Sequence, residues 1–337
     1  MLRNLLNTRL KSCLLAVVLC FTLTPSAGAA DLKAVEAPEA PAAAAKAAPT
    51  QVQVGAYVLR IANVSQKDGT FDVDLWLWFR WKGDGVAPYK TFEIANGVIS
   101  NRTETEVLDD EGFHYTTVRA QATVFHDYDV KRFPLDDHRL TVEVEDSTYD
   151  SSTLQYVADE GTALDPGLNV PGWAVKLAAA KVQEHHYPTS YGMRSSGTAS
   201  AVYSRYIIPV ELARTGNAVL FKEFWISLLS VTLGLLALLV KSDDLDARFG
   251  LGVGSIFAAS ANAFVLSDAL PKTTTVTLAE QINFLAVGAI FLSVFVSIWS
   301  LRLRYAGREE ASLKLDRQAL VVLAVAYLAA NAGLLWL

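Results

Sequence analysis

The sequence predicts an extracytoplasmic all-β domain followed by a bundle of four transmembrane helices. Three observations favour this fold class: short runs of alternating apolar and polar residues from about Val52 to Leu212, four long apolar segments after about residue 219, and an apolar leader before both. The chain has 337 residues, of which 52% are hydrophobic and 19% are charged. This composition is too apolar for a purely soluble protein.

The first 30 residues have the pattern of a secretory signal peptide. Three basic residues precede an apolar core over 13–23, and small residues follow at 27–30. The core is shorter than a membrane-spanning helix, which disfavours an uncleaved anchor. Cleavage would remove Cys13 and Cys20, the two cysteines of the chain, so the mature protein would have no disulfide. Losing the three basic residues would change the formal net charge from -6 to -9, which excludes a basic nucleic-acid-binding surface.

The segment 31–50 is expected to be an Ala/Pro-rich tether, because its composition cannot bury a core and is typical of disorder. The β domain is expected over 51–214. There, short strand-like runs alternate with turn clusters such as 165–167, Asp-Pro-Gly. Many short strands with turns between them indicate either a sandwich or a barrel.

The run FDVDLWLWFRW, residues 71–81, contains three of the seven tryptophans. Its alternate positions from Phe71 are all apolar, which predicts a core face that includes Trp81. The opposite face places Trp76 and Trp78 among charged residues. These two indoles therefore need another partner, which can be a second chain, a ligand or packed loops.

Four apolar segments within an expected transmembrane domain of 215–337 are each long enough to cross a membrane as a helix. They lie at about 220–240, 247–268, 278–303 and 317–337. Basic residues gather around the loop at about 304–316, whereas the connection between the second and third segments contains one basic residue, Lys272. The positive-inside rule therefore predicts that the 304–316 loop is cytoplasmic and that the β domain and both termini lie outside.

The second apolar segment differs from the others because it is rich in glycine and alanine and carries Ser255, Ser260 and Asn262. Small and weakly polar residues suit close helix packing or a water-lined path, and the sequence leaves both interpretations open.

Three motifs, in the correct order, resemble the pentameric ligand-gated ion channels, and especially the bacterial members that lack the Cys-loop disulfide. They are YDVKRFPLDDHRL at 128–140, FDVDLWLWFRW at 71–81 and ALPKTTTVT at 269–277. The resemblance covers nearly the whole chain from about Val52. It implies an extracytoplasmic all-β immunoglobulin-like sandwich followed by a four-helix transmembrane bundle. It also implies a homopentamer in the lipid of a bacterial inner membrane, with the β domain in the periplasm. A small-molecule or ionic agonist would open this pentamer to monovalent cations.

The resemblance further implies three sets of site residues. The residues expected to couple the two domains are Asp68, Phe133, Pro134, Asp136, Arg214 and Pro271. Those expected to line a pore are Asp246, Gly250, Gly254, Phe257, Ala261 and Phe264. Those expected to bind the agonist are Phe92, Tyr149, Tyr187 and Tyr191 on one subunit and Trp76 or Trp78 on its neighbour. Five copies of Asp246 would favour cations, and the two phenylalanine rings would close the pore by dewetting.

Each set also has a purely structural interpretation, as a packing salt bridge, as helix–helix packing or as ordinary loop aromatics. The alternative to a channel is a non-conducting receptor or assembly protein of the same architecture, and the glycine-rich second segment and the lack of a proline within the first support this alternative. The sequence contains no catalytic or zinc-binding signature, so no enzyme activity, metal or cofactor is predicted. The histidines at 114, 126 and 138 have no evident partners.

Overall fold

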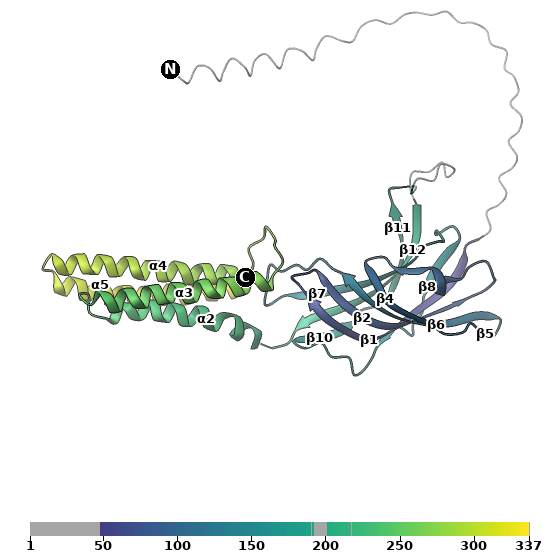
Figure 1. Ribbon diagram of the computed structural model, residues 1–337, viewed down its shortest axis with the longest axis horizontal. Helices are drawn as coiled ribbons and strands as arrows, with labels where there is room; N and C mark the ends of the chain where they lie inside the picture. The colour runs from purple at the N-terminus through teal and green to yellow at the C-terminus, as the bar shows by residue number, and fades with distance from the viewer. Residues whose placement is uncertain (1–47, 190, 192–200, 217, 337) are drawn as a thin grey trace, which may run out of the picture. The chain divides into compact units, whose positions relative to one another are not determined.

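The computed structural model describes residues 48–189, 191, 201–216 and 218–336 (Figure 1). The signal peptide expected over 1–30 lies outside these residues, as does the expected tether up to residue 47. The described residues form a β domain of two sheets followed by four long helices. The predicted fold class is therefore confirmed.

Most strand pairs in the two sheets are antiparallel. The larger sheet contains β1 (Thr50–Ser65), β2 (Thr70–Trp81), β4 (Gly97–Glu104), β5 (Leu108–Asp110), β6 (Phe113–Phe125), β8 (Leu154–Ala158) and β9 (Ala163–Leu164). The smaller sheet contains β3 (Phe92–Ile94), β7 (Asp137–Asp146), β10 (Trp173–Leu177), β11 (Lys181–Tyr187) and β12 (Ala201–Arg214). The main strand orders are β4-β6-β2-β1-β8 and β10-β12-β7-β3, and a short helix, α1 (Pro88–Thr91), precedes β3.

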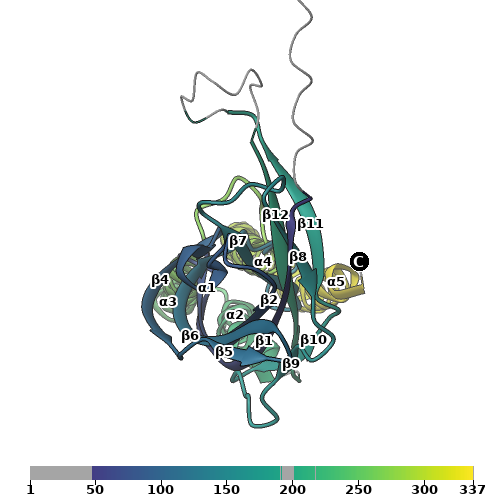
Figure 2. The same ribbon diagram turned by 90° about the vertical axis from the view of Figure 1, so that its right-hand side faces the viewer.

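The strands of the two sheets are seen from one end of the β domain in Figure 2. Both sheets contribute inward-facing side chains to one apolar core. Burial alternates along the whole of β2, so that every second residue from Phe71 to Trp81 is buried. Leu140 of β7 and Ile208 of β12 belong to the same core from the other sheet. Trp81 is 3% exposed, which confirms that it lies on the core face. Because the strands form two sheets, the domain is a sandwich and not a single closed barrel.

Four helices of the described chain are long and apolar enough to cross a membrane. They are α2 (Ala218–Leu236), α3 (Leu245–Ala269), α4 (Leu278–Tyr305) and α5 (Glu309–Trp336). A short 3-10 turn, η1 (Ala237–Leu239), extends α2. Side chains cap two of the helix starts. Asp244 accepts a hydrogen bond from the backbone of Ala247 in α3, and Thr277 and Glu280 form a reciprocal capping box in α4.

The start of α5 corrects one prediction. The fourth helix was expected from about 317 after a loop at 304–316, but it begins at Glu309 and follows only a short turn after Tyr305. Hydropathy misses these first turns of α5 because they are polar. Ser312 and Asp316, however, are buried, and their side chains bond to groups inside the bundle. Polar residues that find partners in this way can belong to a packed helix.

Candidate functional site

A buried polar cluster occupies the end of the β domain from which the chain enters α2. Nε of Arg214 lies 3.2 Å from Oδ1 of Asp136, so the structure brings this expected pair together. The other carboxylate oxygen of Asp136 lies 2.5 Å from Nε2 of His138 and accepts a hydrogen bond from the amide of Gln66. The side chains of Asp136 and His138 are 1% and 2% exposed. Four polar groups thus share one buried site, and two of them were not predicted.

The charges in this cluster balance each other. Burial alone would raise the pKa of the Asp136 carboxyl, but the hydrogen bond from His138 and the charge of Arg214 outweigh burial and hold that pKa below its ordinary value. The Arg214 guanidinium also lies over the Trp173 ring, with 3.9 Å between its central carbon and the ring centroid. The cluster therefore holds Arg214 on one side by charge and on the other by an aromatic face.

Asp68 was expected to be a third member of this cluster, beside Asp136 and Arg214, and this prediction is wrong. Its carboxylate accepts a 2.6 Å hydrogen bond from the Ser65 hydroxyl and closes the turn between β1 and β2. Gln66 of the same turn reaches the cluster instead, donating to Asp136 and accepting from Arg214 at 3.4 Å. An amide can make both contacts, whereas a carboxylate could only accept.

Backbone hydrogen bonds join the Phe-Pro-Leu-Asp loop to the start of α4. The N–H of Leu278 donates to the carbonyl of Lys131 at 2.9 Å, and the N–H of Ala279 donates to the carbonyl of Phe133 at 3.1 Å. The first N–H groups of a helix have no partner within the helix. The loop therefore supplies acceptors that α4 would otherwise lack.

The remaining predicted coupling residues lie at the same junction. Phe133 and Pro134 are buried in the loop, and Pro271, which follows α3, is half-buried. A further ion pair connects the β1–β2 turn to the last turn of α3, where Nζ of Lys67 lies 2.5 Å from Oδ1 of Asp268. Both of its side chains are exposed, so this pair adds little to stability. Its position nevertheless connects the β domain directly to α3.

The expected pore residues share one face of α3. All six of them, Asp246, Gly250, Gly254, Phe257, Ala261 and Phe264, are exposed in the single chain. They follow the three- and four-residue spacing of a helix face. Phe257 and Phe264 are 72% and 78% exposed, so one subunit leaves two large aromatic side chains uncovered. An uncovered apolar stripe of this kind requires a membrane, a partner or a lumen beside it.

The opposite face of α3 explains why polar residues occur in this helix. Asn262 is buried, and its amide donates to the hydroxyl of Ser227 in α2 at 3.0 Å. The Ser227 hydroxyl in turn donates to Asn283 of α4 at 3.3 Å. Ser255 is also buried and bonds to the Gly252 carbonyl within α3. The sequence left two interpretations open, close helix packing and a water-lined path. The contacts of Ser255 and Asn262 agree with close helix packing.

Tyr187 of β11 lies at the centre of an aromatic cluster. Its ring makes edge contacts with His185, at 4.5 Å between centroids, and with Tyr203 of β12, at 5.7 Å. The ring of Tyr191 lies 6.0 Å away in a tilted arrangement. The structure thus brings together two expected agonist residues, Tyr187 and Tyr191, and adds Tyr203.

A charged cluster adjoins these rings. The guanidinium of Arg205 donates to the carboxylates of Glu143 and Glu145 and, at 2.9 Å, to the hydroxyl of Tyr187. Partial desolvation, together with the charges of Glu145 and Asp146, raises the pKa of the nearby Glu93 carboxyl. Several carboxylates therefore surround one guanidinium, and this surface attracts cations more than anions.

Phe92 was expected among the agonist residues, and this prediction is wrong. Phe92 is 3% exposed and packs in the core, with its ring 5.5 Å from that of Phe79. The next residue of β3, Glu93, points to the opposite face and towards the charged cluster, because neighbouring residues of a strand face opposite sides. Tyr149 is half-buried against the core.

Trp76 and Trp78 lie half-buried on the outer face of β2, in the larger sheet. Trp78 has a partner within its own chain, because its indole lies against Gly55, its neighbour on β1. A Cβ atom added at Gly55 would lie 2.2 Å from Cζ2 of Trp78. Trp78 therefore packs against its own chain, in a close approach to the backbone of β1 that only glycine permits.

Replacing Gly55 with alanine is expected to displace the Trp78 indole and to lower the free energy of unfolding by roughly 1–3 kcal/mol, as overpacking does. Thermal unfolding of the purified protein measures this loss. Gly85→Ala is the matched control, because a Cβ atom there meets nothing within 4 Å. Equal melting temperatures of the two variants would contradict the packing of Trp78 on Gly55.

Comparison with known proteins adds an independent observation. The chain is 20% identical, over an alignment of 278 residues that covers 75% of the chain, to the gamma-aminobutyric acid receptor subunit theta of Mus musculus. The chain spans 42% of the length of this relative. No protein-family model matches the chain. Together with the sandwich and the four apolar helices, the similarity supports the pentameric ligand-gated ion channels, the family that the sequence motifs resemble.

Proposed function

We propose that five copies of this chain form a ligand-gated, cation-selective channel in the inner membrane of a bacterium, with the β domain in the periplasm. The exposed face of α3 carries this proposal, since it presents the six expected pore residues on one side of a helix whose other side packs inside the bundle. The similarity to a receptor subunit and the four candidate membrane helices support it.

The charges at the start of α3 favour cations. Asp246 is exposed on the proposed pore face, whereas the only basic residue of α3, Arg248, is buried and paired with Asp316. A ring of Asp246 carboxylates would raise the local cation concentration at the cytoplasmic mouth. The ring of Phe264 would form the hydrophobic constriction, because its side chain is more exposed than that of Phe257, the other phenylalanine of the six.

Neutralising Asp246 is expected to shift the reversal potential in a salt gradient towards zero, because the carboxylate ring that favours cations is lost. The measurement is the current through the reconstituted protein with different salt concentrations on its two sides. Asp243→Asn is the matched control, since Asp243 lies next to α3 but is paired with Arg304 at 3.2 Å. An equal reversal potential for wild type and Asp246→Asn would reject the pore-mouth role.

The agonist is proposed to bind between subunits, next to the Tyr187 cluster of one subunit and the Trp76 face of its neighbour. The surplus of carboxylates around Arg205 favours a cationic small molecule or an inorganic cation. Arg205 of β12 donates a hydrogen bond to the hydroxyl of Tyr187, so binding at this ring would act directly on β12, which leads into α2.

A non-conducting receptor or assembly protein is the second candidate. The apolar groove on α3 favours it, because Phe257 and Phe264 line this groove and make the proposed lumen hard to wet. The two candidates differ in current but not in assembly. An intact pentamer that passes no current under screens of amines, protons and calcium would favour the second, and a monomer or dimer in mild detergent would reject the first.

A further inference from the structure

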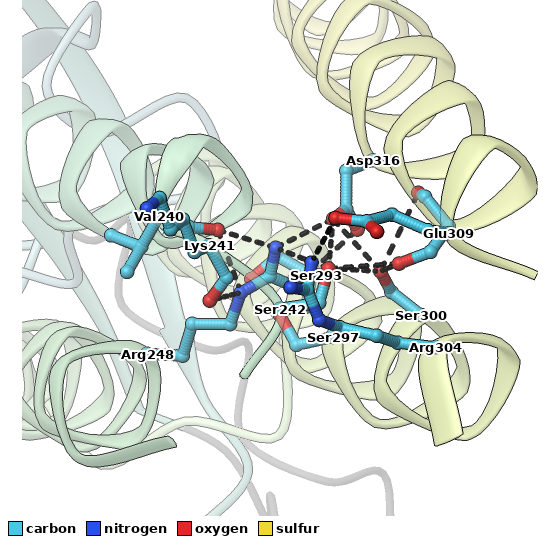
Figure 3. A network of polar contacts seen from close by, with 11 residues as sticks. Val240, Lys241, Ser242, Arg248, Ser293, Ser297, Ser300, Arg304, Glu309 and Asp316 are labelled. Carbon is cyan, nitrogen blue, oxygen red and sulfur yellow. Dashed lines mark hydrogen bonds and ion pairs between the residues drawn. The ribbon is translucent and has the colours of Figure 1, made fainter. Parts of the chain in front are cut away.

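A buried ion pair joins α3 to α5 at the end of α3 that lies away from the β domain (Figure 3). Nη2 of Arg248 lies 2.5 Å from Oδ2 of Asp316, and Nη1 lies 3.4 Å from Oδ1. The two side chains are only 3% and 4% exposed. Two nitrogens of one guanidinium thus face both oxygens of one carboxylate, which is the directional geometry of an arginine–carboxylate pair.

Further polar groups hold this pair in place (Figure 3). Nε of Arg248 donates to the carbonyl of Val240, just after η1, at 2.9 Å. The Asp316 carboxylate accepts hydrogen bonds from Ser300 of α4 at 2.8 Å and from Ser242 at 3.3 Å. The pair therefore connects the segment after η1 with α3, α4 and α5, and its charges are satisfied without water.

Arg248 follows Asp246 by two residues, so the two side chains point about 200° apart around α3. The structure accordingly exposes Asp246 and buries Arg248. The two residues nevertheless lie within one helix turn, and salt screens a buried charge such as that of Arg248 much less than an exposed one. An uncompensated charge on Arg248 would therefore oppose the field of Asp246, and Asp316 cancels that charge.

We propose that Asp316 is a selectivity-determining residue of the channel, although it belongs to α5 and not to α3. It neutralises Arg248, so that the ring of Asp246 alone sets the electrostatic potential at the cytoplasmic mouth. The inference rests on the proposed function, because it takes the exposed face of α3 as the pore wall. Asp316 does not touch a permeating ion, so it acts as a positioning residue through Arg248.

A cysteine placed one turn above the mouth reports this potential without any current. The reporter is Gly250→Cys in full-length protein whose Cys13 and Cys20 are replaced by serine. The rates of its modification by a cationic and an anionic methanethiosulfonate reagent are measured on the purified oligomer. Asp316→Asn is expected to lower the ratio of cationic to anionic rates by roughly threefold or more, because an unpaired positive charge repels one reagent and attracts the other.

Two controls separate this effect from a general disturbance. Glu309→Gln removes an exposed carboxylate from the start of the same helix, where it is paired with Arg304 at 3.0 Å, and should change the ratio much less. The double variant Arg248→Gln/Asp316→Asn removes both charges of the pair and should restore the original ratio. An assembled Asp316→Asn protein with an unchanged ratio would overturn the proposal.

If Asp316→Asn does not assemble, Arg248→Lys replaces it. Lysine keeps the charge but lacks the guanidinium fork that binds the carboxylate and the Val240 carbonyl, so the ratio should fall in the same direction by a smaller factor. An unchanged ratio in that variant would likewise overturn the role of Asp316. A wild-type current with an unchanged ratio would reject this inference and leave the channel standing. A changed ratio without any current would reject the channel and with it the selectivity role, and would leave only the electrostatic effect of Asp316 on the exposed face of α3.

Discussion

Replacing Asp136 with asparagine is expected to lower the free energy of unfolding by roughly 3 kcal/mol, because removing one partner of a buried ion pair leaves the other charge uncompensated. The side chain of Asp136 is 1% exposed and serves Arg214, His138 and Gln66 together, so no water can replace it without rearrangement. Thermal and denaturant unfolding of the oligomer in detergent measure the loss. In the proposed channel, the same change should also weaken the response to agonist.

The next residue gives the matched control. Asp137 is exposed and only accepts a 3.2 Å hydrogen bond from the backbone of Arg214, so Asp137→Asn should cost much less. The pKa of Asp136 is lowered in the folded state, so its stabilising contribution is present above its unfolded pKa of about 4 and is lost as the pH falls below that value. Wild type and Asp136→Asn should therefore differ at neutral pH and converge in acid. A constant difference at every pH would contradict the ion-pair explanation.

Replacing Arg205 with methionine is expected to have an effect of similar size, roughly 3–5 kcal/mol, because it leaves the buried Glu145 and its neighbour Glu143 without their cation. Methionine keeps much of the length and apolar stem of arginine, so the loss reports charge more than packing. Unfolding measurements again provide the value. Tyr187 would lose one of its two hydroxyl partners, so agonist sensitivity of the channel should fall as well.

The pH dependence of Arg205→Met has a different cause from that of Asp136→Asn, because here the variant gains stability in acid, whereas there the wild type loses it. The pKa of Glu93 is raised in the folded state, so its ionisation destabilises the protein and acid relieves that penalty. Without Arg205, which opposes this rise, the pKa of Glu93 should increase further, and Arg205→Met should recover stability as the pH falls into the acid range. Arg139→Met on the exposed side of β7 is the matched control and should show no such recovery. A pH-independent loss in Arg205→Met would reject the electrostatic account.

The periodicity of the sequence was sufficient to predict the two-part fold because burial acts on every second residue of a strand. The run from Phe71 to Trp81 shows this, since its alternate residues are all buried. Hydropathy likewise located the four long helices. It failed at the start of α5, because the partners of Ser312 and Asp316 belong to other helices and leave no local signal in the sequence.

Site residues were predictable where a motif fixes the backbone and not where a face had to be guessed. Asp136 and Arg214 meet as the family resemblance implied. Phe92 was misplaced because a shift of one residue turns a strand side chain from one face of the sheet to the other. Gln66 was missed because its partner His138 lies 72 residues away in the sequence, which spacing cannot reveal. His138 lies only two residues after Asp136, and this spacing at the start of β7 was a usable signal.

The two hydrogen bonds from the start of α4 to the carbonyls of Lys131 and Phe133 involve only main-chain atoms. No replacement other than proline at the two donor positions removes either bond, so an alanine scan would record this junction as silent even if it transmits force. Exchanging the amide that donates from Leu278 for an ester deletes one bond while keeping the side chain. An amide-to-ester replacement, therefore, is the experiment that tests whether the loop transmits movement to α4 or only packs against it.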